Sequence, residues 1–73
     1  MNIGVMIKNY LEENGITQAF LSRKTGIETA KLNLALNGMR RLSLEEYAKI
    51  CGALNLDTNY FLRPWIPEGK EVG

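Results

Sequence analysis

One stretch, Thr17 to Asn37, constrains the fold of this 73-residue chain more than any other. Its apolar spacing predicts two short helices, one from Gln18 to about Thr25 and one from Thr29 to Leu36, joined by a tight turn. Thr17 can cap the first helix, and Gly26 tolerates the positive φ that often follows a helix end. Helices of about two turns do not hold together alone, because helix nucleation is costly. The sequence therefore predicts that flanking helices support this pair.

The flanking segments carry helical patterns of their own. Asn2 can cap a first helix that runs to Asn14. Its apolar stripe consists of Ile3, Ile7, Tyr10 and Leu11. Ser43 and Glu46 have the spacing of a capping box, which predicts a fourth helix that ends at Asn55. The stripe expected for this helix consists of Leu44, Tyr47, Ala48, Cys51 and Leu54. Together these patterns predict an all-α fold.

A short fifth helix is predicted near the C-terminus. Asp57 can cap it, and we expect it to run to about Leu62. The residues expected to close the core here are Tyr60, Phe61 and Leu62. Pro64 and Pro67 cannot continue a helix, so the helical part is expected to end before them.

The length of the chain allows one domain and no second core. We expect a helical domain over residues 1–63 and a C-terminal tail over residues 64–73, ordered in part at Trp65 and Ile66. This apolar pair either folds back on the monomer or helps to pair two chains.

Charge is distributed unevenly along the chain. From Arg23 to Arg41 five basic residues stand against Glu28 alone, whereas the remaining residues carry four basic and seven acidic side chains. The basic part coincides with the two-helix stretch and the loop after it, where a polyanion would lie. Accidental clustering on a solvated surface is the alternative interpretation.

Several classes of function find no support in the composition. The chain has one cysteine, Cys51, and no histidine, so it lacks an internal disulfide, a metal-ligand set and a nucleophile with its base. With no paired-carboxylate motif and no phosphate loop, we expect no catalytic activity, cofactor or metal. No apolar run approaches the ~20 residues that span a bilayer, and no signal peptide is evident. These features indicate a cytoplasmic protein in which Cys51 is a core residue.

Five groups of residues fall at fixed offsets in and beside the two-helix stretch: Ile16-Thr17-Gln18, Leu21-Ser22, Gly26-Ile27, Leu32 and Asn37-Gly38. This ordered pattern resembles the helix-turn-helix of the XRE family, the phage Cro and repressor type of transcription regulator. With the flanking helices, the resemblance covers roughly Ile3 to Leu62. It implies a five-helix, lambda-repressor-like domain that binds double-stranded DNA and regulates transcription, in the simplest case as a repressor that occupies an operator.

The resemblance also implies where DNA would be bound. In the family, the exposed side of the second of the two helices enters the major groove, where Asn can pair with adenine, Lys can reach phosphate or guanine, and apolar side chains can contact thymine methyls. Gln18, in the first turn of the preceding helix, and the basic loop after Gly38 would contact phosphates. The candidate DNA-binding residues are Gln18, Thr29, Ala30, Lys31, Asn33, Leu34, Asn37, Arg40 and Arg41.

Three residues depart from the family pattern. Glu28 stands where a Ser or Thr cap is usual, and Leu34 and Phe20 place apolar side chains where polar ones are common. Two exposed apolar residues near one face are compatible with a protein contact. The alternative function is therefore a protein-interaction module of the same fold, antirepressor or antitoxin-like, that uses Phe20 and Leu34 against a protein partner.

A single reading helix of about two turns contacts too few base pairs to select one site from a genome. Family members solve this problem by pairing as two-fold dimers on a palindromic site. We therefore expect a homodimer, at least on DNA. The apolar residues left after the core is assigned are the candidates for the dimer contact: Phe61, Trp65 and Ile66.

Overall fold

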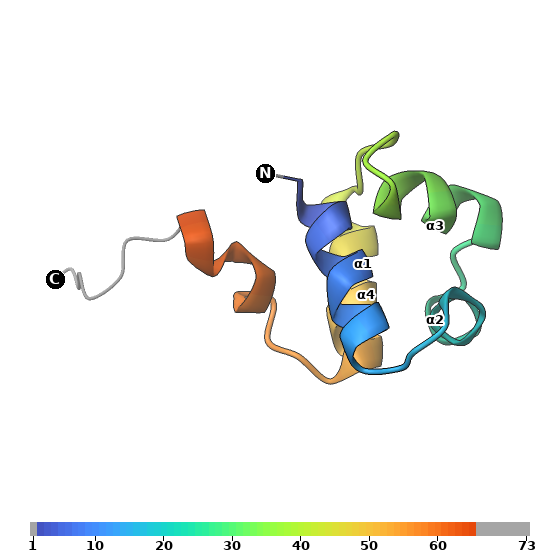
Figure 1. Cartoon of the computed structure of the whole chain (residues 1–73), viewed down its shortest axis with the longest axis horizontal. Helices are drawn as coiled ribbons and strands as arrows, with labels where there is room; N and C mark the ends of the chain where they lie inside the picture. Colours follow the sequence, from blue (N-terminus) through green and yellow to red (C-terminus); the bar gives the residue numbers. More distant parts are fainter. Residues whose placement is uncertain (1, 66–73) are drawn as a thin grey trace, which may run out of the picture.

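The computed structural model describes residues 2–65, and over this range the chain is built from helices without a strand. The elements are α1 (Ile3–Glu13), α2 (Gln18–Thr25), α3 (Thr29–Leu36), α4 (Leu44–Leu54) and the 3-10 helix η1 (Tyr60–Trp65). In Figure 1, α1 and α4 occupy the middle of the molecule, α2 and α3 lie on one side of them, and η1 lies on the other. The predicted all-α fold is confirmed, with the fifth helix present as a short 3-10 helix.

The helix ends lie where the capping residues predicted them. Asn2 caps α1, Thr17 caps α2 and Ser43 caps α4, each with a side-chain oxygen that accepts a backbone N–H. Gly26 ends α2 at φ 80°, a left-handed conformation that glycine adopts without strain. Glu28 precedes α3 but makes no capping hydrogen bond with its side chain. The start of α3 therefore depends on the turn before it and on tertiary packing.

A single apolar cluster joins these helices. In the described part of the chain, α1 packs on α3, α2 packs on both α3 and α4, and η1 packs on α1. The buried members of the cluster are Ile7, Leu11, Leu21, Ile27, Leu32, Leu36, Tyr47, Ile50, Cys51 and Phe61. Because one side of α3 is used for this packing, its opposite side is left at the surface.

Gly4 marks the closest approach between α1 and α3. A Cβ atom built on Gly4 would lie 2.0 Å from the carbonyl oxygen of Ala35 and 2.9 Å from its carbonyl carbon. Real Cβ atoms do not approach backbone so closely, so the two helices touch through a position where only glycine fits.

The apolar stripe of α4 differs from the prediction. Ile50 is fully buried together with Tyr47 and Cys51, whereas Ala48 is exposed and Leu44 is 83% exposed. At about 100° per residue, the buried residues centre on a direction about 110° from Ala48, which explains its exposure. Leu44 lies closer to that direction but occupies the first turn, at the end of the stripe. The predicted burial of Leu44 and Ala48 was wrong.

The segment after α4 also differs from the prediction. The expected Asp57-capped helix ending before Pro64 is replaced by η1, which begins at Tyr60 and includes Pro64. The φ of proline suits a 3-10 helix, and the clash that excludes proline from an α-helix involves the carbonyl four residues earlier. Tyr47 supports the start of this segment, because its hydroxyl donates to the carbonyl oxygen of Thr58. Burial raises the pKa of Tyr47 to about 12.

Phe61 belongs to the monomer core and is not available for a dimer contact. Its side chain is 2% exposed and meets the rings of Tyr10 and Tyr47 edge to face, with centroid distances of 5.7 and 6.5 Å. The expectation that Phe61 helps to pair two chains was therefore wrong. Ile66, and the side chain of Trp65, lie outside the described part.

One ion pair links the loop after α3 to the start of α4. Arg40 donates from both terminal nitrogens to the carboxylate of Glu46, each at 3.2 Å. Glu46 also accepts the backbone N–H of Ser43 as part of the predicted capping box. The Arg40 guanidinium, followed by the Ser43 N–H, lowers the pKa of the Glu46 carboxyl from its ordinary value of 4.5.

This lowered pKa predicts an acid-dependent loss of stability. The contribution of the Glu46 carboxylate to the free energy of unfolding is complete above about pH 4.5 and is lost as the pH falls through the lower folded-state pKa. We expect Glu46→Gln, which cannot titrate, to lack this component, which is at most about 1 kcal/mol for a partly exposed ion pair. Urea unfolding of both proteins at pH 7 and pH 3 measures the difference. Equal losses in the two proteins would contradict the assignment.

Candidate nucleic-acid interface

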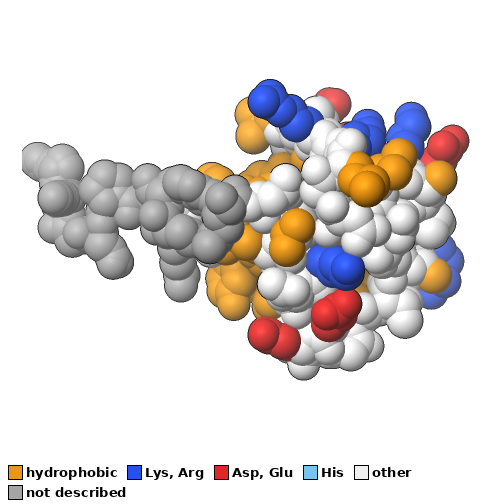
Figure 2. Space-filling model, turned by 45° about the horizontal axis from the view of Figure 1, so that its top comes forward, with side chains coloured by type: hydrophobic (Ala, Val, Ile, Leu, Met, Phe, Trp, Pro, Cys, Tyr) orange, Lys and Arg blue, Asp and Glu red, His pale blue; other side chains and the backbone are white. Residues whose placement is uncertain are grey.

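The outward side of α3 carries the residues predicted to read DNA. Leu32, Ala35 and Leu36 are fully buried and form the inner side of the helix. The exposed residues on the outer side and at its end are Ala30, Lys31, Asn33, Leu34 and Asn37. Figure 2 shows basic and apolar side chains, with acidic ones beside them, on the upper part of the molecule, the region where α3 lies. The helix therefore presents a mixed polar, basic and apolar surface.

Hydroxyl groups hold the turn between α2 and α3. Ser22 Oγ donates to the carbonyl oxygen of Ile27 at 2.6 Å, and Thr25 Oγ1 accepts the N–H of Ile27 at 3.2 Å. Thr29 Oγ1 donates to Ser22 Oγ at 3.3 Å, so the hydroxyl hydrogen of Thr29 points toward α2. The turn fixes how α3 is held against α2, and while the bond to Ser22 is made, Thr29 acts toward a partner as an acceptor.

A row of amide side chains connects α2, α3 and α1. Asn33 Nδ2 donates to Gln18 Oε1 at 3.3 Å, and Asn37 Nδ2 donates to the Asn33 carbonyl oxygen at 3.0 Å and to Asn33 Oδ1 at 3.3 Å. At the far end, Lys8 Nζ donates to Asn37 Oδ1 at 2.9 Å. The structure thus brings together three predicted site residues and adds one, Lys8, that was not predicted.

The basic residues of the predicted site differ in exposure and in whether a carboxylate holds them. Lys31 and Arg41 are exposed. Arg40 is partly buried and held by Glu46, so a phosphate would have to compete with that carboxylate. Lys8 was missed because its position on α1 marks it only as a surface residue. A side-chain contact between residues 29 positions apart leaves no periodic signal in a sequence.

The two apolar residues behind the alternative function lie on different helices. Leu34, on α3, is 44% exposed. Phe20, on α2, is half-buried and lines a hollow at the start of that helix with Gly15, Ile16 and Thr17. The ammonium of Lys24 lies 5.7 Å from the centre of the Phe20 ring, a cation–π distance. Phe20 is thus partly covered by its own helix.

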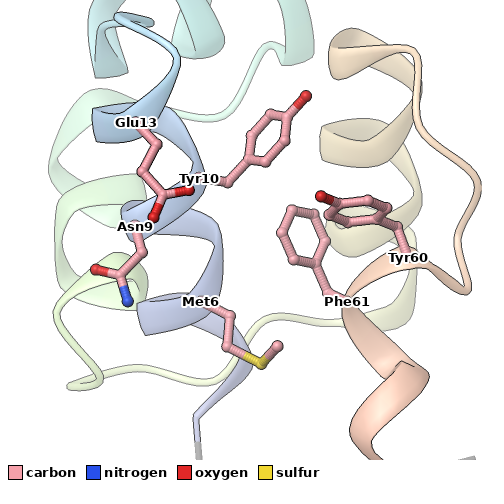
Figure 3. Close-up of a pocket in the computed structure, with 6 residues that line it drawn as sticks. All are labelled: Met6, Asn9, Tyr10, Glu13, Tyr60 and Phe61. Atoms are coloured by element: carbon pink, nitrogen blue, oxygen red, sulfur yellow. The ribbon is translucent and has the colours of Figure 1, made fainter.

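A second hollow, of about 220 Å³, lies between α1 and η1 (Figure 3). It is lined by Met6, Asn9, Tyr10, Glu13, Tyr60 and Phe61. Sites for drug-sized ligands usually measure about 300–1,000 Å³ and bury most of the ligand. We interpret this hollow as the seam where η1 packs on α1. Within residues 2–65, the structure shows no group of three or more potential metal ligands and no helix long and apolar enough to cross a bilayer.

The comparisons with known proteins agree with this geometry. The sequence matches the family model of the Cro/C1-type helix-turn-helix DNA-binding domain over residues 6–59. The matched region contains α2, α3, α4 and most of α1, and it includes every predicted DNA-binding residue. No curated protein and no solved structure matches the chain.

Proposed function

We propose that this chain, which belongs to the Cro/C1-type helix-turn-helix DNA-binding family, is a cytoplasmic transcription regulator that places α3 in the major groove of an operator. The observation that carries the proposal is the exposed outer side of α3, which presents Lys31, Asn33 and Asn37 away from the core. Binding, and not catalysis, is the activity of this surface. Repression by occupancy is the simplest way in which such binding regulates a gene.

Base reading is assigned to the middle of α3. The bonds of the Asn33 amide to Gln18 and Asn37 use one hydrogen and one acceptor position, which leaves one donor and one acceptor. Adenine presents the complementary pair in the major groove, at N7 and N6. Ala30 and Leu34 are suited to thymine methyl groups, and Lys31 to guanine or phosphate. Thr29 is left with an acceptor role.

Phosphate contacts are assigned to the ends of this surface. Gln18 lies in the first turn of α2, and its amide nitrogen is a donor near the positive end of the helix dipole. Arg41 is exposed in the loop after α3, whereas Arg40 must first leave Glu46. We therefore give Arg41 the larger role in positioning the domain on the DNA backbone.

Selection of bound fragments from genomic DNA, followed by sequencing, tests the proposal and defines the operator. On the selected site we expect Asn33→Ala to cost ~1–3 kcal/mol, with a much smaller effect on unrelated DNA. Arg41→Ala is the matched comparison, because loss of a phosphate contact weakens all sequences about equally. Fluorescence anisotropy with both duplexes measures the two effects. A uniform loss in the Asn33 variant would contradict its reading role.

We also propose that two chains pair on the operator. One short reading helix is too small a source of specificity, and a two-fold dimer doubles it. The same selection tests this point, since a dimer requires a palindromic site with half-sites about 34 Å apart. Recovery of single, asymmetric half-sites would contradict the dimer.

The alternative of a protein-interaction module keeps support from one observation, the 44% exposure of Leu34 on the reading side of α3. On DNA, Leu34→Ala would weaken the selected site only. If this substitution instead left DNA affinity unchanged and abolished a complex with another protein, the outer side of α3 would be a protein contact.

A further inference from the structure

Lys8 lies on α1, outside the helix-turn-helix, yet its ammonium reaches the C-terminal end of α3. Lys8 Nζ lies 2.9 Å from Oδ1 of Asn37, the residue that follows α3. The close packing of α1 on α3 at Gly4 brings the two helices within this distance. Lys8 is half-buried and held by a hydrogen bond, so it is partly ordered before any ligand arrives.

The hydrogen-bond inventory separates Lys8 from Asn37. The amide nitrogen of Asn37 donates to two oxygens of Asn33, the backbone carbonyl oxygen at 3.0 Å and Oδ1 at 3.3 Å. A phosphate would therefore have to compete with Asn33 for the amide group of Asn37. An ammonium has three hydrogens, and the bond to Asn37 uses one of them. Two donors and a full positive charge remain at the edge of the outer side of α3, the surface proposed to contact DNA.

We propose that Lys8 is a phosphate-binding residue of the DNA interface and that Asn37 is the positioning residue that orients it. This proposal rests on the proposed function, and it extends the DNA-contacting surface from α2 and α3 onto α1. Lys8 complements the negative end of the α3 dipole in the free protein, and the same position places it beside the DNA backbone when α3 lies in the major groove.

The test replaces Lys8 and follows DNA binding as a function of salt. Lys8→Met keeps the length and apolar stem of the side chain but removes the charge, and Lys8→Arg restores the charge. Lys49→Met is the matched control, because Lys49 is an exposed lysine on α4 outside the proposed surface. Circular dichroism melting checks that each variant folds.

We expect Lys8→Met to reduce the slope of log affinity against log salt by about 0.9 and to weaken binding to all sequences roughly 5- to 10-fold at 0.1 M salt. Lys8→Arg and Lys49→Met should keep the wild-type slope. A folded Lys8→Met variant with an unchanged slope would overturn the assignment of Lys8 alone. Failure of the wild-type chain to bind any duplex would instead overturn the proposed function, and with it this extension.

The role of Asn37 is tested by removing it in both backgrounds. If Asn37 acts through Lys8, Asn37→Ala weakens binding in the wild-type background and has no further effect in Lys8→Met. If Asn37 itself contacts phosphate, its removal causes the same fold-loss in both backgrounds, which would overturn its positioning role. The salt slope distinguishes these outcomes from a change in folding, because a structural defect alone does not remove one counterion.

Discussion

Alanine at position 4 is expected to lower the melting temperature of the domain by roughly 4–24 °C. The added Cβ would lie 2.0 Å from the carbonyl oxygen of Ala35, a backbone atom that cannot rotate away. Either α1 moves off α3 or both helices distort, and overpacking of this kind costs typically ~1–3 kcal/mol. For a domain of this size, each kcal/mol corresponds to about 4–8 °C. Thermal unfolding followed by circular dichroism measures the shift.

Gly52 provides the matched control for this substitution. Gly52 lies within α4, is exposed, and a Cβ built on it would meet nothing within 4 Å. Gly52→Ala should therefore raise stability by about 0.5–1 kcal/mol through helix propensity alone. Both substitutions replace a helical glycine by alanine, so stability changes of opposite sign would identify the contact with Ala35 as the cause. Similar stabilisation by both would show that α1 and α3 do not approach as closely as described.

DNA affinity is expected to fall on the order of a hundredfold per chain when salt is raised from about 50 to 200 mM. Lys8, Lys31 and Arg41 are available cations near the reading surface, and Arg40 joins them if phosphate displaces Glu46. About four phosphate contacts at about 0.9 each give a log-log slope near −3.6, and a dimer doubles it. Anisotropy titrations across this salt range measure the slope directly.

The salt slope also separates the two candidate functions. A protein contact through Leu34 and Phe20 depends on apolar burial, and salt screening affects it only weakly. Affinity for DNA that hardly changes over this range, or no binding to any duplex at low salt, would favour the protein-interaction module.

Local signals in the sequence predicted most of the fold. The bounds of α2 and α3 follow from Thr17, Gly26 and the apolar spacing between them, and each of these signals acts within a few residues. The capping box at Ser43 and Glu46 was found for the same reason. The family resemblance, confirmed by the match over residues 6–59, added the arrangement of the helices that local signals cannot supply.

What the sequence could not predict depends on contacts between distant residues. The α4 stripe was assigned without knowing which helices would cover it, so Ile50 was missed and Leu44 was included wrongly. The need for glycine at position 4 comes from Ala35, on another helix. In the candidate site, the bond from Lys8 to Asn37 has the same origin, because the two residues are 29 positions apart. The ion pair of Arg40 with Glu46 spans only six residues, but it joins a loop to α4 and so follows no helical spacing. The predicted roles of individual DNA-binding residues stay predictions.

Because Cys51 is buried, the rate at which its thiol is labelled can report transient unfolding of the domain. This thiol is the only one in the chain, is fully inaccessible to solvent, and has its pKa raised by burial, so it resists attack while the domain is folded. A thiol reagent can modify it only in molecules that have opened transiently. When reclosing is fast, the labelling rate follows the population of open molecules. The lifetime of the unlabelled Cys51 thiol in the presence of reagent thus measures the stability of the folded domain, without a dye, a tag or denaturant.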